Sequence, residues 1–152
     1  MDSVSVWLAR AQVSRRAGRC DADAEQHLER AFGCSRRLAV YGTLAPGERH
    51  HDELAACPGT WAAGTVTGHR AERDHPVFTF AADGPPVPVQ LLVSAALPGH
   101  WPKLDAFEGD GYCRIPVPVA LADGTATVAW LYEARVPVAP AQPETTRPRP
   151  VE

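Results

Sequence analysis

The stretch YCRIPVPVALADGTATVAWLYEA, residues 112–134, decides the fold that this chain is expected to adopt. Its two halves, 112–121 and 125–134, each read as a β-strand because β-branched and other apolar residues recur in them. Asp123-Gly124 lies between the halves and is a typical hairpin turn. We therefore expect an antiparallel hairpin near the C-terminal end of the chain.

Shorter apolar runs upstream of this hairpin predict further strands and two short helices. The strands are expected at 38–41, 61–68, 77–80 and 87–95, and the helices at 48–57 and 98–107. The helices do not alternate regularly with the strands, which disfavours a doubly wound parallel sheet. The pattern favours an α+β fold: a small mixed-strand β-barrel, or a strongly curved sheet, with short flanking helices.

The two ends of the chain differ from this central part, 36–135. Residues 1–35 are expected to form a helical N-terminal extension, in which Asp23 and Gln26 have the spacing of a capping box and Gly33 ends a helix. The pattern leaves open whether this extension packs on the main domain or on a second subunit of a homodimer. Residues 136–152 are rich in proline and are expected to form a disordered or polyproline-like tail.

The overall composition narrows the class of protein. The chain has 152 residues, of which 45% are hydrophobic and 22% charged, as in one ordinary globular domain. A net charge of -3 offers no basic patch for nucleic acid, and no apolar run has the length of a membrane span or a signal peptide. We therefore expect a cytoplasmic protein with no nucleic-acid or membrane partner. Cysteine and histidine spacings favour neither disulfides nor a metal site.

The first candidate for chemistry is the corner VYGTLAPG, residues 40–47, at the end of a predicted strand. Gly42 allows the backbone to approach a ligand closely. Backbone N–H groups of such a loop can bind a carboxylate or an oxyanion. The corner lacks the glycine and lysine spacing of a phosphate loop. A strand-end turn without function remains the alternative.

The second candidate is the corner LDAFEGDGY, residues 104–112, at the end of a predicted helix. That helix is expected to bury Trp101, Leu104 and Phe107, so Glu108 would stand among aromatic rings at a helix C-terminus. Both surroundings disfavour the ionised carboxylate and raise its pKa toward the range useful for proton transfer. The alternative is a solvated Glu108 capped by glycine, with Asp105 as the rival carboxylate.

Together, these two corners, in this order, resemble the γ-glutamylcyclotransferase-like superfamily, in particular its bacterial AIG2-like branch. The segments Leu97-Pro98-x-His100-Trp101 and Trp130-x-Tyr132-Glu133 are similar to that family as well. The resemblance spans 36–135 and implies a small mixed-strand β-barrel. His50 or His51 stands where the family often has asparagine, and the charged segment 70–76 departs from its pattern.

The resemblance also implies a reaction and roles for particular residues. The α-amine of a γ-glutamyl amide attacks its own γ-carbonyl, which releases 5-oxoproline and a free amine or amino acid, without a metal or cofactor. Glu108 would be the catalytic acid and base, and the substrate-binding residues would be Tyr41, Gly42, Thr43, Leu44 and Tyr112. Whether Asp105 or Glu48 assists Glu108 stays open. The alternatives are a non-catalytic small-molecule binding protein and an enzyme that deprotects a γ-glutamylated natural-product intermediate.

Overall fold

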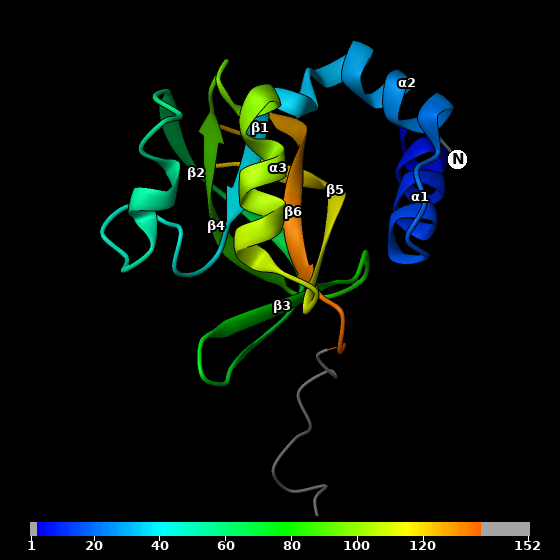
Figure 1. Ribbon diagram of the computed structural model, residues 1–152. Helices are drawn as coiled ribbons and strands as arrows, with labels where there is room; N and C mark the ends of the chain where they lie inside the picture. The colour runs from blue at the N-terminus through cyan, green and yellow to red at the C-terminus, as the bar shows by residue number, and fades with distance from the viewer. Residues whose placement is uncertain (1–2, 138–152) are drawn as a thin grey trace, which may run out of the picture.

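The computed structural model describes residues 3–137, and within them six strands form one sheet that closes on itself (Figure 1). The strands are β1 (Arg37–Val40), β2 (Thr60–Glu72), β3 (Pro76–Phe80), β4 (Pro86–Val93), β5 (Tyr112–Leu121) and β6 (Ala126–Ala134). The α-helices are α1 (Ser3–Arg16), α2 (Ala22–Phe32) and α3 (Leu97–Glu108), and the 3-10 helices are η1 (Cys34–Arg36) and η2 (His51–Leu54). The expected hairpin is β5–β6.

The barrel is closed by a short pairing between β2 and β5. The strand order is β3-β2-β4-β1-β6-β5, so β3 stands outside the closed ring of five. The contact of β1 with β6 is parallel and the other pairings are antiparallel. At the closing point Gly64 faces Leu121, and a Cβ at position 64 would lie 2.7 Å from the Ala120 carbonyl oxygen. This barrel confirms the predicted α+β, mixed-strand fold.

The strands at the centre of the barrel are buried on both faces. Along β6, Val128, Trp130 and Tyr132 pack toward the helices, whereas Ala129 and Leu131 pack inside the barrel. This alternation follows the two-residue period of a strand. Because β6 is apolar without interruption, every second side chain packs under the helices α1, α2 and α3, and the side chains between them pack in the barrel interior.

The N-terminal helices lie against the barrel beside β5 and β6 (Figure 1). Leu8 and Leu28 join the core cluster that contains Trp130. The Gln12 side-chain amide donates to the carbonyl of Pro116 at 2.8 Å. The extension therefore shares its core with the barrel, while the division at residue 35 stays a prediction. Of the predicted tail, residues 138–152 lie outside the described part.

Four local expectations were wrong. The N-cap of α2 is Asp21, whose carboxylate accepts from the N–H of Ala24, and not Asp23. The helix expected at 48–57 is only the turn η2, and β2 is five residues longer overall than expected at 61–68. Phe107 was expected to be buried but is 37% exposed. Trp101, Leu104 and Phe107 are spaced by three residues, which is less than a full helical turn, so Phe107 points away from the face that buries Trp101. The face that buries Trp101 carries Glu108 instead, seven residues on.

No helix within residues 3–137 is both long and apolar enough to span a membrane.

Candidate active site

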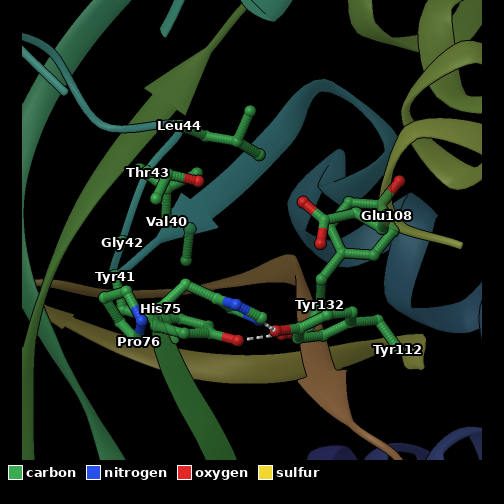
Figure 2. Close-up of a pocket in the computed structure, with 11 residues that line it drawn as sticks. Val40, Tyr41, Gly42, Thr43, Leu44, His75, Pro76, Glu108, Tyr112 and Tyr132 are labelled. Carbon is green, nitrogen blue, oxygen red and sulfur yellow. Dashed lines mark hydrogen bonds between the residues drawn. The ribbon is translucent and has the colours of Figure 1, made fainter. Parts of the chain in front are cut away.

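The predicted site residues, although far apart in the chain, line one small pocket at the end of β1 (Figure 2). Its volume is about 50 Å³. The lining residues are Ala39, Val40, Tyr41, Gly42, Thr43, Leu44, His75, Pro76, Glu108, Tyr112 and Tyr132. Glu108 reaches in from the end of α3, opposite the loop that follows β1. Their roles in substrate binding and catalysis remain predictions.

The loop 41–44 is held by its carbonyl groups. The Gly42, Thr43 and Leu44 oxygens accept from Ala45 N at 3.0 Å, His50 N at 2.9 Å and the His51 ring at 2.9 Å. Within residues 3–137, the N–H groups of Gly42, Thr43 and Leu44 donate to no protein group. Three consecutive backbone donors at the pocket are therefore available to a carboxylate or an oxyanion.

Gly42 lies close to a neighbouring side chain. A Cβ there would lie 3.2 Å from the Cβ of Pro76 at the start of β3. The loop and the β2–β3 hairpin thus approach each other so closely that a larger residue at position 42 would require a small shift of one of them. The guanidinium of Arg70, on the same hairpin, also donates to the Tyr41 carbonyl at 3.3 Å.

Glu108 is a partly buried carboxylate without a protein partner. No group in the described part of the chain donates a hydrogen bond to it, and no cation there pairs with it. Burial raises the pKa of Glu108 to about 7, and the nearby negative charge of Asp105 adds to the rise. At neutral pH the carboxyl group is therefore able both to accept and to donate a proton.

Asp105, the rival carboxylate, is committed to other contacts. It accepts two hydrogen bonds from Arg114, at 2.9 and 3.1 Å, and one from the Tyr132 hydroxyl at 2.6 Å. Burial alone would raise the pKa of Asp105, but these hydrogen bonds outweigh burial and the pKa lies below its usual value. Neither Asp105 nor the exposed Glu48 lines the pocket. Asp105 acts on Glu108 through its charge.

The hydroxyl groups of two pocket tyrosines, Tyr41 and Tyr112, form hydrogen bonds within the pocket. The Tyr112 hydroxyl is hydrogen-bonded to Nε2 of His75, and the Tyr41 hydroxyl donates to the Tyr132 carbonyl at 2.6 Å. Burial raises the pKa of both Tyr41 and Tyr112. The phenol of Tyr41 therefore anchors the loop to β6, whereas its ring lines the pocket.

Sequence reasoning missed His75 and Pro76 as pocket residues. They lie in the charged segment that departs from the family pattern, so no motif pointed to them. Tyr132 also lines the pocket and was missed. It belongs to the Trp130-x-Tyr132-Glu133 motif, so the sequence contained a signal that could have pointed to it.

The family profile described as "Gamma-glutamyl cyclotransferase, AIG2-like" matches residues 38–149. The chain belongs to this family. The match includes every predicted site residue and confirms the resemblance noted in the two corners. It also continues beyond residue 135, into the proline-rich segment, and it begins after α1 and α2. Family membership supports a cyclotransferase-type enzyme and leaves its substrate open.

Several solved structures are similar to this AIG2-like chain. YkqA from Bacillus subtilis shares 25% identity with a TM-score of 0.55, over 65% of this chain and 35% of that protein. The chain therefore spans about a third of the length of YkqA. An AIG2-like protein from Mus musculus shares 18% identity with a TM-score of 0.55, over 69% of this chain and 80% of that one.

An uncharacterized protein from Pyrococcus horikoshii shares 20% identity with a TM-score of 0.53, over 72% of this chain and 86% of that one. At these identities the mouse and Pyrococcus structures support the fold alone. A search of curated proteins gave no match.

Proposed function

We propose that the chain is a γ-glutamyl cyclotransferase that converts a γ-glutamyl amide into 5-oxoproline and a free amine or amino acid. One observation carries the proposal. Glu108, unpaired in the described structure and with a pKa of about 7, faces the loop after β1. In that loop the N–H groups of Gly42, Thr43 and Leu44 donate to no group within residues 3–137. The first feature suits proton transfer and the second suits a substrate carboxylate.

The proposed reaction begins with the substrate held in a folded conformation. The N–H groups of Gly42, Thr43 and Leu44 bind the α-carboxylate of the γ-glutamyl group. This brings the α-amine close to the γ-carbonyl carbon, and ring closure is then intramolecular. Much of the catalytic advantage would come from selecting this conformer.

Glu108 moves the protons in the two steps that follow. Its carboxylate accepts a proton from the α-ammonium, and the free amine forms a bond to the γ-carbonyl carbon. When the tetrahedral intermediate collapses, the carbonyl re-forms, the bond to the leaving nitrogen breaks and Glu108 returns its proton to that nitrogen, while the ring nitrogen gives up its second proton to the departing amine or to water. The products are 5-oxoproline and the amine, and Glu108 ends ionised as it began. These reaction steps require no metal or cofactor.

The test is release of 5-oxoproline, measured by mass spectrometry, from a panel of γ-glutamyl peptides and γ-glutamyl amines. We expect at least one substrate to be turned over and the Glu108→Gln variant to lose at least about 100-fold in rate. Glu48→Gln is the matched control, because Glu48 is exposed outside the pocket. A folded Glu108→Gln protein that keeps near-full activity would contradict the assigned role. Ligand binding without any product would favour the non-catalytic alternative.

A further inference from the structure

A second cavity adjoins the pocket of Glu108. Its volume is about 440 Å³, and Tyr112 and Tyr132 line both spaces. The remaining residues come from the end of α1 and the link to α2, from the α3–β5 corner, and from the region where β6 ends. They are Arg15, Gly18, Arg19, Cys20, Asp105, Gly109, Asp110, Cys113, Arg114 and Arg135.

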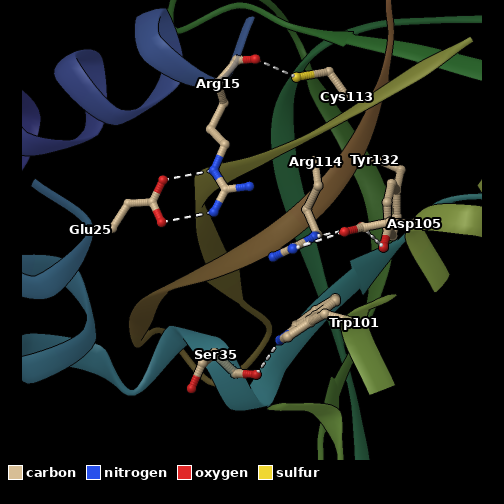
Figure 3. A network of polar contacts seen from close by, with 8 residues as sticks. All are labelled: Arg15, Glu25, Ser35, Trp101, Asp105, Cys113, Arg114 and Tyr132. Atoms are coloured by element: carbon tan, nitrogen blue, oxygen red, sulfur yellow. Dashed lines mark hydrogen bonds and ion pairs between the residues drawn. The ribbon is translucent and has the colours of Figure 1, made fainter. Parts of the chain in front are cut away.

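The N-terminal wall of this cavity is bound firmly to the barrel. The thiol of Cys113 donates to the Arg15 carbonyl at 3.3 Å (Figure 3). The next residue, Arg16, forms two hydrogen bonds of 2.8 Å with the buried carboxylate of Glu133 in β6. The end of α1 is therefore held in place beside β5 and β6, and the wall is part of the folded structure.

The charges on the cavity wall favour an anion. Arg15 is paired with Glu25 at 2.7 Å and Arg114 with Asp105 at 2.9 Å, so these four charges compensate one another (Figure 3). Arg19 and Arg135 have no acidic partner within residues 3–137. Asp110 is the one lining carboxylate without a cationic partner in the same part of the chain. The wall thus keeps an excess of positive charge.

The position of the cavity matches the leaving half of a γ-glutamyl substrate. Glu108 must lie beside the leaving nitrogen to protonate it, and the next two residues, Gly109 and Asp110, line the second cavity. A group attached to that nitrogen can extend along the ring of Tyr112, which both spaces share. The cavity also lies partly outside the family match, because Arg15, Arg19 and Cys20 precede residue 38.

We propose that this cavity is the subsite for the leaving group and that Arg19 and Arg135 bind a carboxylate there. The preferred substrates would then be γ-glutamyl amino acids or peptides rather than γ-glutamyl derivatives of simple amines. This inference rests on the proposed cyclotransferase function. It assigns to the N-terminal extension a part in substrate selection.

Two substrates that differ only in this carboxylate provide the first test: γ-glutamyl-L-alanine and γ-glutamyl-ethylamine. We expect kcat/KM to be about 10-fold or more higher for the alanine compound, since an ion pair of about 1.4 kcal/mol gives that ratio. Arg19→Gln and Arg135→Gln should each lower kcat/KM for γ-glutamyl-alanine about 3- to 10-fold. Neither variant should change kcat/KM for γ-glutamyl-ethylamine. Arg36→Gln is the control, because Arg36 is exposed and lines neither cavity.

Equal turnover of the two substrates, unaffected by both arginine variants, would overturn the subsite and leave the cyclotransferase function standing. Failure of both substrates to yield 5-oxoproline would instead count against that function. Binding can still be tested in that case, because it does not require turnover.

The exposed thiol of Cys20 reports on occupancy of the cavity. Cys34, Cys57 and Cys113 are buried, so an alkylating reagent should modify Cys20 selectively in the folded protein. In the inactive Glu108→Gln variant, γ-glutamyl-alanine should slow this alkylation several-fold more than γ-glutamyl-ethylamine does. Equal protection by the two compounds, or none by either, would overturn the subsite.

Discussion

At the scale of single residues, two carboxylates on one helix are driven to opposite protonation behaviour. Asp105, whose side chain is half-exposed, receives hydrogen bonds from Arg114 and Tyr132, which lower its pKa although partial desolvation opposes them. Glu108 receives none from the described residues, and burial raises its pKa to about 7. The partners that separate these two carboxylates come from β5 and β6, so the difference is set by tertiary contacts.

The pH dependence of the rate follows from the raised pKa of Glu108. As the base, Glu108 must be ionised to accept the proton of the α-ammonium. We expect kcat/KM to rise tenfold per pH unit below about pH 7, where the Glu108 pKa lies, and to level off above it. A rate profile for 5-oxoproline release between pH 5 and 8 measures this limb. A half-maximal rate at a pH near the ordinary glutamate pKa would contradict the assignment of Glu108.

The same pKa predicts that ionised Glu108 destabilises the fold. The folded pKa of about 7 lies above the ordinary value of 4.5, so between these values the folded state binds more protons than the unfolded state. The free energy of unfolding therefore falls as pH rises through this window. Glu108→Gln should be about 1 to 3 kcal/mol more stable than wild type at pH 8 and nearly equal at pH 4.5. Urea denaturation at the two pH values tests this, and a pH-independent difference would count against it.

Gly42 provides a test of the close approach between the pocket loop and Pro76. In Gly42→Ala the new Cβ would lie 3.2 Å from the Pro76 Cβ, so the loop must shift by a few tenths of an ångström. We expect kcat/KM to fall about 10-fold or more with less than about 1 kcal/mol of lost stability. Gly99→Ala is the control, because a Cβ there meets nothing within 4 Å. Unchanged kinetics in Gly42→Ala would show that the loop tolerates displacement.

At the scale of elements, the decisive contact is the one between α1 and β6. The carboxylate of Glu133 is 5% exposed and accepts hydrogen bonds from Arg16 and from the N–H of Phe80. Because a buried charge is costly without its partner, this ion pair fixes where α1 sits on the barrel. The same contact holds the N-terminal wall of the second cavity.

Removing one partner of this ion pair should be strongly destabilising. Arg16→Ala leaves the Glu133 carboxylate buried with one hydrogen-bond donor, and we expect a loss of about 2 to 4 kcal/mol in the free energy of unfolding. Arg10→Ala on the same helix is the matched control, since the Arg10–Asp21 pair is exposed and should cost below about 1 kcal/mol. Urea denaturation measures both. Equal effects of the two substitutions would show that burial of Glu133 is unimportant.

At the scale of the whole molecule, the extension and the outer face of the barrel share one hydrophobic cluster, which is separate from the cluster inside the barrel. Leu8, Ala11, Ala24 and Leu28 are buried in the same cluster as Leu104 and Trp130. A homodimer, which the sequence left open, stays a prediction. The intramolecular contacts already account for the buried face of the extension.

Deletion of residues 1–33 should therefore unfold or severely destabilise the barrel. Burial of Leu8 and Leu28 alone contributes about 1.5 to 3 kcal/mol each, and Glu133 would lose Arg16 as well. Thermal denaturation followed by circular dichroism, together with the yield of folded protein, tests this expectation. A truncated chain with an unchanged melting temperature would show that the barrel folds independently.

The features that the sequence determined depend on residues close together in the chain. Strand period and the Asp123-Gly124 turn predicted the β5–β6 hairpin, and two glycine corners pointed to Glu108 and to the loop after β1. Apolar residues at helical spacing also predicted apolar surroundings for Glu108, although they wrongly added Phe107 to the buried face. Each of these signals is a local backbone preference or a repeat of side chains along one element.

What only the tertiary structure decided depends on residues that meet across the barrel. His75 enters the pocket because β2 is longer than expected and turns back at that point, which no local motif marks. The pairing of Asp105 with Arg114 and Tyr132, and the second cavity beside α1, arise only when three separate segments converge. Burial and charge pairing set the pKa values of this site, and both are properties of the folded packing rather than of neighbours in the sequence.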